Sequence, residues 1–381
     1  MRLQLPTTPA RFSTAIVGSV LLISLAACGT TESDGGSDGA SDGGSSTAAA
    51  SSLPAEASQR LEAAMQPVAA FPGPTDPISP APGTKVTVIE CSAIGESCVG
   101  TANGAKAAGE ALGWDVTVVD GKGNPTDWNA AMSAALAGGA QAIILSAVPP
   151  ALVQAGMDQA KEKGVPVIYA HGLDAQGATS LVAVDRAEQG RVIADYIAQD
   201  SGGTGQVLVL RDPEFPELEV MDDAFKKELA TACPDCKVAS EQKFTLGAMT
   251  TDVPTIVKGA LQANPDIDYV FAPYDAAATF VNQGIQASGQ GPVKLVATGG
   301  GTSAIKLIED GQLNATAGVP SEWIGYQSID AIARNLAGQA IPEVPVVSGL
   351  VVKDNVSQQA VTGSYDGGFD YASAYEKLWG K

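Results

Sequence analysis

The sequence contains one histidine, His171, and aromatic residues make up only 5% of its 381 positions. Basic residues are also scarce: 22 Lys and Arg stand against 42 Asp and Glu, which gives a formal net charge of −20. No stretch forms the basic stripe that contacts with phosphates require, and this argues against a nucleic-acid partner. The chain also lacks a Gly-x-Ser-x-Gly elbow, a phosphate-binding loop and a metal-ligand cluster. We therefore expect no enzyme activity, no cofactor and no metal site.

The N-terminus predicts export from the cytoplasm. Arg2 and Arg11 are followed by an apolar run over residues 15–27, which is too short to stay in a bilayer as a spanning helix and is typical of a signal peptide (residues 1–27). The run ends in Leu-Ala-Ala-Cys28, which resembles the lipobox of bacterial lipoproteins, so we expect Cys28 to carry a lipid. Residues 28–52 have the composition of a flexible tether. These features predict an extracytoplasmic lipoprotein anchored to the outer face of the cell membrane.

Four further cysteines form two close pairs, Cys91 with Cys98 and Cys233 with Cys236. In an exported protein two local disulfides are the simplest interpretation. The Cys-Pro-Asp-Cys sequence of the second pair also matches a redox motif, but it follows a helical pattern instead of opening a helix, which favours a structural disulfide. A zinc site made by all four cysteines is disfavoured by their spacing.

The rest of the chain predicts an α/β fold. Residues 53–65 have helical apolar spacing, and a proline-rich lead-in with six prolines continues to residue 83. Short β-branched runs then alternate with alanine-rich helical stretches, which predicts two units of parallel sheet with helices on both faces. The predicted strands cover residues 86–90, 115–120, 142–145, 165–169, 181–184, 206–211, 237–244, 269–272 and 294–297. The predicted helices cover residues 104–112, 127–137, 151–163, 188–199, 217–230, 250–263 and 303–308.

Several collinear motifs resemble the type I periplasmic binding proteins, specifically their ribose/galactose-binding branch. They occupy residues 104–116, 118–125, 164–168, 184–197, 264–272 and 308–316, and the resemblance extends over residues 85–353. It implies two Rossmann-like lobes joined by three crossovers near Asp185, Val319 and Val347. The lobes would comprise residues 84–184 plus 320–347 and residues 185–319 plus 348–381.

The same resemblance implies a function. The protein would be a monomer that captures a small solute between its lobes, closes by hinge motion and delivers the solute to the permease of an ABC importer. A sensor that reports ligand occupancy to a membrane receptor kinase is the alternative that the sequence leaves open. A transcription regulator with the same fold is excluded by the export signal and the missing helix-turn-helix.

Candidate ligand-binding residues follow from the rule that ligands lie beyond the carboxyl ends of the strands. His171 directly follows a predicted strand, Arg211 ends another, and Trp128 suits either a ligand or helix packing. A glycine-rich turn at residues 299–301 offers free backbone N–H groups to an anion or to a neutral ligand. The full candidate set is Ser92, Glu96, Ser97, Trp128, His171, Arg211, Tyr274, Asp275, Gly299, Gly300 and Trp323.

Most residues with which this branch binds sugars are replaced. The loop at residues 94–98 has no aromatic residue, and His171-Gly172 stands where an Asp-Arg pair is expected. Of a later Asn-Asp pair only Asp275 remains, an expected Arg falls near Met221, and the Asp of a Gly-x-Asp-Gly motif is absent from residues 298–302. Sugar recognition depends on charged hydrogen bonds and ring stacking, so these replacements argue against a simple pentose or hexose.

Overall fold

The computed structural model describes residues 53–381, which form two α/β lobes. The expected signal peptide (1–27), the lipidated Cys28 and the tether (28–52) lie outside the described residues. Among the helices of residues 53–381, none combines the length and the apolar character needed to cross a bilayer. Both expected disulfides are present, with Cα–Cα distances of 5.8 Å for Cys91–Cys98 and 5.3 Å for Cys233–Cys236.

The N-terminal lobe is built on a five-stranded parallel sheet in the order β2-β1-β3-β4-β5. Its central strand β3 is buried on both sides along its whole length, as its continuous apolar sequence predicts. The strands are β1 (Lys85–Glu90), β2 (Asp115–Asp120), β3 (Ala142–Ser146), β4 (Val167–Ala170) and β5 (Ser180–Val182).

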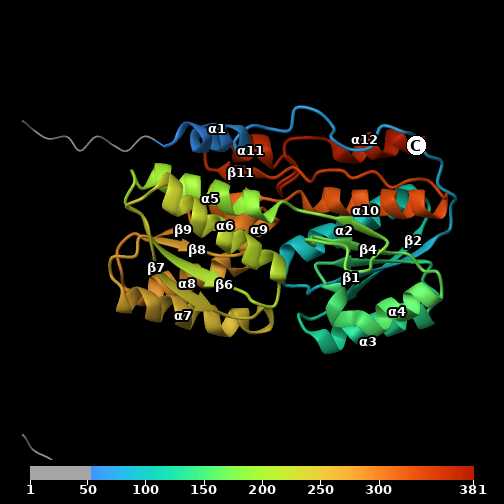
Figure 1. The fold of residues 1–381 in the computed structure, drawn as a ribbon, viewed down its shortest axis with the longest axis horizontal. Coiled ribbons are helices and arrows are strands. Elements are labelled where there is room, and N and C mark those ends of the chain that lie inside the picture. The colour runs from blue at the N-terminus through green and yellow to red at the C-terminus, as the bar shows by residue number, and fades with distance from the viewer. Residues whose placement is uncertain (1–52) are drawn as a thin grey trace, which may run out of the picture. The chain divides into compact units, whose positions relative to one another are not determined.

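Helices cover both faces of this sheet (Figure 1). One face carries α2 (Glu96–Ala111), α10 (Ser321–Leu336) and α12 (Tyr371–Leu378), which share a core with the sheet. The other carries α3 (Pro125–Ala137) and α4 (Gln154–Glu162), the latter preceded by the 3-10 turn η1 (Pro150–Val153). Helix α3 begins at Asn124, whose side chain accepts a hydrogen bond from the Asp127 N–H, with Pro125 at the first helical position.

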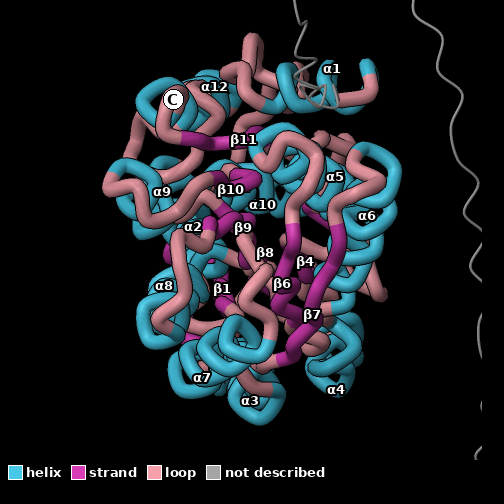
Figure 2. Tube along the Cα trace, turned by 90° about the vertical axis from the view of Figure 1, so that its left-hand side faces the viewer, coloured by secondary structure: helices cyan, strands magenta, loops and turns pink. Residues whose placement is uncertain are grey.

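The C-terminal lobe contains a six-stranded sheet in the order β11-β10-β9-β8-β6-β7 (Figure 2). All neighbours are parallel except β10 and β11, which are antiparallel. The sequence patterns did not predict these two strands. The strands are β6 (Gln206–Arg211), β7 (Lys237–Lys243), β8 (Tyr269–Phe271), β9 (Lys294–Gly299), β10 (Ala315–Gly318) and β11 (Gly349–Val352).

Two helix pairs enclose this second sheet. Helices α5 (Arg186–Asp200) and α6 (Pro216–Ala232) pack together on one side, and α7 (Met249–Ala263) and α8 (Ala278–Ser288) pack together on the other (Figure 1). Asp185 caps α5 by accepting a hydrogen bond from the Glu188 N–H. The remaining short elements are η2 (Leu246–Ala248), η3 (Asp275–Ala277), α9 (Thr302–Glu309) and α11 (Val356–Gln359).

The three expected crossovers connect β5 to α5, β10 to α10, and α10 to β11. Val184 in the first crossover pairs with Val346 in the third, so these two connections run side by side. They form a narrow hinge through which the lobes are covalently joined. Two lobes joined by so few chain segments can rotate relative to each other about those segments.

The chain ends add two further connections. Helix α1 (Ala55–Ala64) packs on α5 and β11 of the C-terminal lobe, burying Ala57 and Leu61, and Arg60 forms an ion pair of 2.7 Å with the buried Asp195. The lead-in then crosses to the N-terminal lobe, where Ile78 is buried.

Helix α12 corrects our expectation that residues 348–381 belong to the C-terminal lobe. Its Tyr371 and Tyr375, together with Trp379 at its C-cap, pack at four-residue spacing against Trp323 and Tyr326 of α10, in the core of the N-terminal lobe. The aromatic faces of α12 and α10 thus complement each other.

The two terminal connections contact each other as they cross. The Val68 N–H donates to the Gly367 carbonyl at 2.7 Å, and the Phe71 ring stacks on Phe369 with centroids 6.0 Å apart. A paired strap therefore joins the lobes in addition to the hinge.

Candidate functional site

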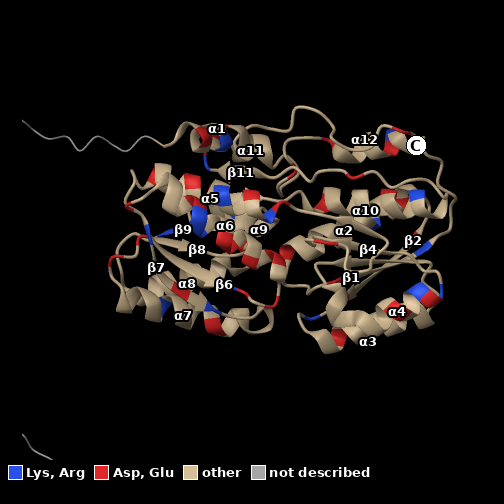
Figure 3. Cartoon of the chain, viewed as in Figure 1, with Lys and Arg blue, Asp and Glu red and all other residues tan. Residues whose placement is uncertain are grey.

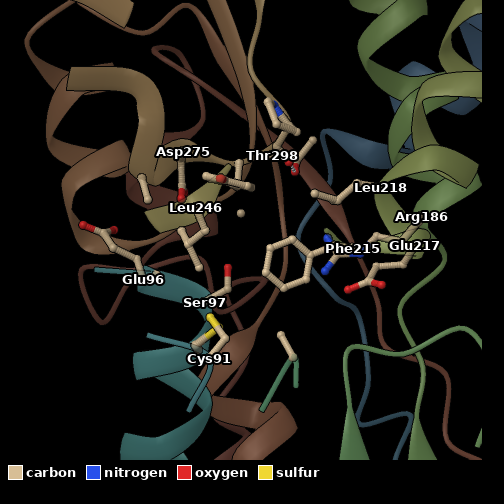
Figure 4. A pocket seen from close by; sticks show the side chains of 17 residues that line it. Cys91, Glu96, Ser97, Arg186, Phe215, Glu217, Leu218, Leu246, Asp275 and Thr298 are labelled. Atoms are coloured by element: carbon tan, nitrogen blue, oxygen red, sulfur yellow. Dashed lines mark hydrogen bonds between the residues drawn. A yellow bond between two sulfur atoms is a disulfide. The ribbon is translucent and has the colours of Figure 1, made fainter. Parts of the chain in front are cut away.

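A cavity of about 60 Å³ lies between the lobes. Its residues follow the carboxyl ends of strands from both sheets. Cys91 follows β1, Ala147 follows β3, and Leu246 follows β7, while Pro273 follows β8 and Gly299 ends β9. Ligands of open α/β sheets bind at this edge, so the topology itself places the candidate site. Figure 4 shows the cavity from close by.

The N-terminal lobe contributes a disulfide-closed loop. Cys91 and Cys98 enclose Glu96 and Ser97, which begin α2 and line the cavity. The indole Nε1–H of Trp128 on α3 donates to the Cys91 carbonyl at 2.9 Å, so this hydrogen bond holds the loop in addition to the disulfide. A loop fixed in this way loses little conformational entropy when a ligand binds.

The C-terminal lobe contributes an aromatic wall. Phe215 stands before α6 with its ring between the two ends of the cavity (Figure 4). Tyr274 forms part of the same wall, and its hydroxyl donates to the buried Asp212 at 2.8 Å. The Phe244 ring meets Tyr274 edge to face at 5.7 Å. The wall therefore presents fixed ring surfaces, which suit apolar C–H groups of a ligand.

One end of the cavity holds two buried side chains of opposite charge. Arg186 is 8% exposed and Glu217 is 3% exposed. Arg186 Nη1 donates to Gln189 at 2.9 Å, but its Nε is buried without a hydrogen-bond partner in the described part of the chain. Burial lowers the pKa of Arg186 and raises that of Glu217, and each charge partly offsets the shift of the other. A buried donor without a partner is costly, so a ligand acceptor at this end would relieve a real deficit.

The other end of the cavity carries carboxylates. Asp275 is 2% exposed and accepts hydrogen bonds from the N–H groups of Gly300 and Gly301, the latter at 2.8 Å. Burial, followed by the charge of Glu96, raises the pKa of Asp275 to about 7. Gly299 is required beside it, because a Cβ at this position would lie 2.7 Å from the Asp275 carboxylate.

Acidic side chains dominate the cavity. Glu96, Glu217 and Asp275 face a single cation, Arg186, and acidic residues also prevail over the lobes as a whole (Figure 3). Such a site disfavours a ligand with a carboxylate or phosphate group, because its charge would be buried against like charges. No group of three or more potential metal-ligating side chains occurs among residues 53–381.

Five of the eleven residues that the sequence singled out line this cavity, and six lie elsewhere. The five are Glu96, Ser97, Tyr274, Asp275 and Gly299. Ser92 is buried in the turn before α2, and Gly300 lines a neighbouring groove between the lobes.

Three predicted contacts are corrected by the structure. Trp128 and Trp323 are each 1% exposed and belong to the cores of the N-terminal lobe, where helix packing fixes their direction. The Arg211 guanidinium lies 2.9 Å from Asp222 on α6 and 3.4 Å from Glu241 on β7, and it does not line the cavity. These two carboxylates, together with that of Glu219, account for the position of Arg211 without a ligand.

His171 lies behind the cavity instead of lining it. It is fully buried, and its Nε2 is 2.8 Å from the Thr101 hydroxyl. Burial, together with nearby Arg186, lowers the pKa of His171 to about 3, so the ring is neutral at physiological pH.

Sequence reasoning missed Arg186, Phe215, Glu217, Leu218 and Leu246. Arg186 follows the first crossover and not a strand end, so the strand-end rule does not reach it. Phe215 had an available signal: it directly precedes Pro216, which occupies the first position of a helix after β6.

Residues 96–340, which include most of both lobes, match the family described as the periplasmic binding protein domain. The chain belongs to the periplasmic binding proteins. Its fold and motifs place it in the type I class and in the ribose/galactose branch of that class. Members of this family bind small molecules outside the cytoplasm.

Relatives agree with this placement. The chain is 24% identical over 258 residues to the ribose import binding protein of Escherichia coli, covering 66% of this chain and 84% of the relative. It is 25% identical over 231 residues to the ribose import binding protein of Bacillus subtilis, covering 60% and 74%.

Solved structures share the fold of this periplasmic binding protein. An ABC transporter solute-binding protein from Agrobacterium vitis with bound α-D-tagatopyranose superposes with a TM-score of 0.65, at 20% identity, covering 74% of this chain and 99% of the other. One from Mycobacterium smegmatis with bound glycerol has a TM-score of 0.65 at 23% identity, covering 73% and 96%.

Proposed function

We propose that this protein captures an uncharged polyhydroxylated solute, a sugar or a polyol, in the cavity between its lobes. The observation that carries the proposal is the pair formed by Arg186 and Glu217. A buried guanidinium with a free Nε–H and a buried carboxylate stand at the same end of the cavity. A hydroxyl group both accepts and donates hydrogen bonds, so adjacent hydroxyls of a polyol satisfy both side chains.

The rest of the cavity supports the same ligand class. Phe215 and Tyr274 offer ring surfaces to the C–H face of a sugar or polyol. Asp275 and Ser97 supply further acceptors and donors at the opposite end. Solutes bound by structural neighbours include allitol, α-D-tagatopyranose and glycerol, all of them polyhydroxylated. The Asn and Arg residues of the sugar-binding pattern are missing, so we expect this protein to bind its solute with other residues than a ribose receptor uses.

The wider role that we propose is delivery of this solute to the permease of an ABC importer. Relatives named as import binding proteins and neighbours named as ABC transporter proteins support this role. We further propose that the protein acts as a monomer tethered to the membrane through a lipid on Cys28. Labelling with a radioactive fatty acid tests the anchor, because Cys28→Ala should abolish incorporation.

A titration-calorimetry panel of neutral sugars, alditols, sugar acids and sugar phosphates tests the ligand class. We expect binding by at least one neutral polyol or sugar, and no binding by its acidic counterpart. Glu217→Gln should weaken the best ligand by about 10- to 100-fold, the range of a charge-assisted hydrogen bond. Glu110→Gln, an exposed change on α2, serves as the control. Exclusive binding of an acidic ligand would contradict the proposal.

A further inference from the structure

Helix α9 begins without a capping side chain of its own. Its N-cap is Gly301, which has no side chain, although its φ of −66° and ψ of 171° are the extended values at which a capping residue sits. The first N–H groups of a helix have no partner within the helix. An external acceptor is therefore needed at this helix end.

The two acceptors at this helix end come from different lobes. The Gly301 N–H donates to Asp275 of the same lobe at 2.8 Å. The Ser303 N–H donates to Oε2 of Glu96, which belongs to α2 of the N-terminal lobe, at 3.2 Å. The Glu96 carboxylate thus reaches across the cleft and caps a helix of the opposite lobe. Its negative charge also suits the positive end of that helix.

Close packing accompanies this contact. A Cβ added to Gly301 would lie 2.0 Å from Glu96 Oε2 and 2.8 Å from the Glu96 Cβ. Rotation of the carboxylate alone would not clear the second contact, so a side chain at position 301 must displace Glu96 or the segment that carries it. Glu96 also lines both the ligand cavity and the groove that contains Gly300 and Gly301. It therefore forms the wall between the enclosed site and this outer groove.

We propose that Glu96 is an interlobe latch: it supplies the missing cap of α9 only when the lobes are closed, and so holds the cleft shut around a ligand. The Cys91–Cys98 disulfide fixes the segment that carries Glu96, so the carboxylate is already positioned when the lobes meet. This inference rests on the proposed function, since it assigns a closing contact to that same cleft.

The latch would stabilise the closed arrangement of the lobes and not the open one. A contact that exists only in the closed state shifts the opening equilibrium, and it raises ligand affinity by the same factor when the open state predominates. Loss of a helix cap changes equilibria by roughly 2- to 30-fold. The contact between Glu96 and the Ser303 N–H should change ligand affinity within that range through the opening equilibrium.

Gly301→Ser separates the latch from simple helix stability. The new hydroxyl would cap α9 from its own chain, while the Cβ would displace Glu96. We expect slow hydrogen exchange of the Ser303 amide to persist in this variant, yet ligand affinity to fall by about 2- to 30-fold. Ser303→Ala keeps the backbone N–H and is the matched control, with affinity and exchange close to those of the unaltered protein.

Glu96→Ala gives the complementary result. Hydrogen exchange of the Ser303 amide, measured by NMR on the purified protein saturated with its solute, should become about 2- to 30-fold faster, because the amide loses its acceptor in the closed state. Gly301→Ser added to Glu96→Ala should cause less loss of affinity than Gly301→Ser alone, because Ala removes the carboxylate, which is the nearer of the two contacts, and leaves only the contact with the Cβ of residue 96. Unchanged Ser303 exchange in Glu96→Ala would overturn the latch.

The two proposals fail in different ways. If the solute panel finds no ligand, the proposed function fails and the latch, which rests on it, fails with it. If a solute binds and its affinity is unaffected by Gly301→Ser, the latch is wrong and the proposed function stands.

Discussion

The burial of Asp275 makes a quantitative prediction about stability and pH. Its folded-state pKa of about 7 lies above its ordinary value of 3.8, mainly because of burial and then because of Glu96. Between these two values the folded protein holds a proton on this carboxyl that the unfolded chain has released. The free energy of unfolding should therefore fall as the pH rises through this window, and level off above pH 7.

The magnitude follows from the size of the shift. About three pKa units correspond to about 4 kcal/mol over the whole window, of which about 3 kcal/mol is lost between pH 5 and pH 8. Asp195, Asp212 and Asp222 have pKa values raised to about 6 by burial, so they add losses in the same direction below pH 6. A comparison with Asp275→Asn is needed to isolate one carboxyl.

Urea unfolding of the ligand-free protein and of Asp275→Asn, followed from pH 5 to pH 8, measures this contribution. The difference in unfolding free energy between the two should change by about 3 kcal/mol, with the unaltered protein losing more as the pH rises. Glu96→Gln should move the midpoint of this change to lower pH, because one of the two causes of the raised pKa is removed. A difference that does not vary with pH would refute the burial argument.

Three other perturbations test separate parts of the account. Arg186→Gln should weaken binding of the best solute by about 10- to 100-fold in calorimetry; unaltered affinity would place the ligand elsewhere. Replacing Cys91 and Cys98 by Ser should lower the free energy of unfolding by about 2.5 kcal/mol and should also weaken binding of the solute. Replacing Cys233 and Cys236 by Ser should lower the free energy of unfolding by about 2 kcal/mol and leave the affinity unchanged. Equal effects of the two replacements on affinity would contradict the role of the first loop. Tyr365→Ala should destabilise the protein by about 3–5 kcal/mol in urea unfolding, since the ring packs on Gly300, Gly318 and Gly349; a loss below 1 kcal/mol would contradict that packing.

Much of the fold was predictable from the sequence because its strands are strongly patterned. The apolar run at residues 142–145 is typical of a strand in a sheet covered on both faces, and it lies in β3 of the structure. Strand β10 was missed because its sequence, Ala-Thr-Ala-Gly, has little β-propensity. Its small residues are explained only by tertiary packing: the Tyr365 ring lies where a side chain on Gly318 would go.

The position of the last helix was not predictable for a similar reason. Nothing local in residues 371–381 distinguishes one lobe from the other as a packing partner. In the fold, this helix meets the aromatic residues Trp323 and Tyr326 of α10, and the segment before it contacts Val68 and Phe71 of the lead-in. Such long-range pairing leaves no periodic signal in the sequence.

The site was half predictable. The strand-end rule found Asp275 and Gly299, because parallel strands bring their carboxyl ends to one edge. It does not fix the direction in which a side chain on a helix points, so it offered Trp323 as a ligand contact and left Trp128 open between a ligand contact and helix packing, whereas both side chains are buried in the cores. Arg186 was missed because its role depends on burial, which only the assembled lobes create.

A crystal structure of the protein with the tightest-binding solute of the panel tests the central claim most directly. We predict the solute in the interlobe cavity, with one of its hydroxyl groups within hydrogen-bond distance of Arg186 Nε and a C–H face against the Phe215 ring. A solute bound outside this cavity, with Arg186 Nε still lacking a partner, would contradict the account.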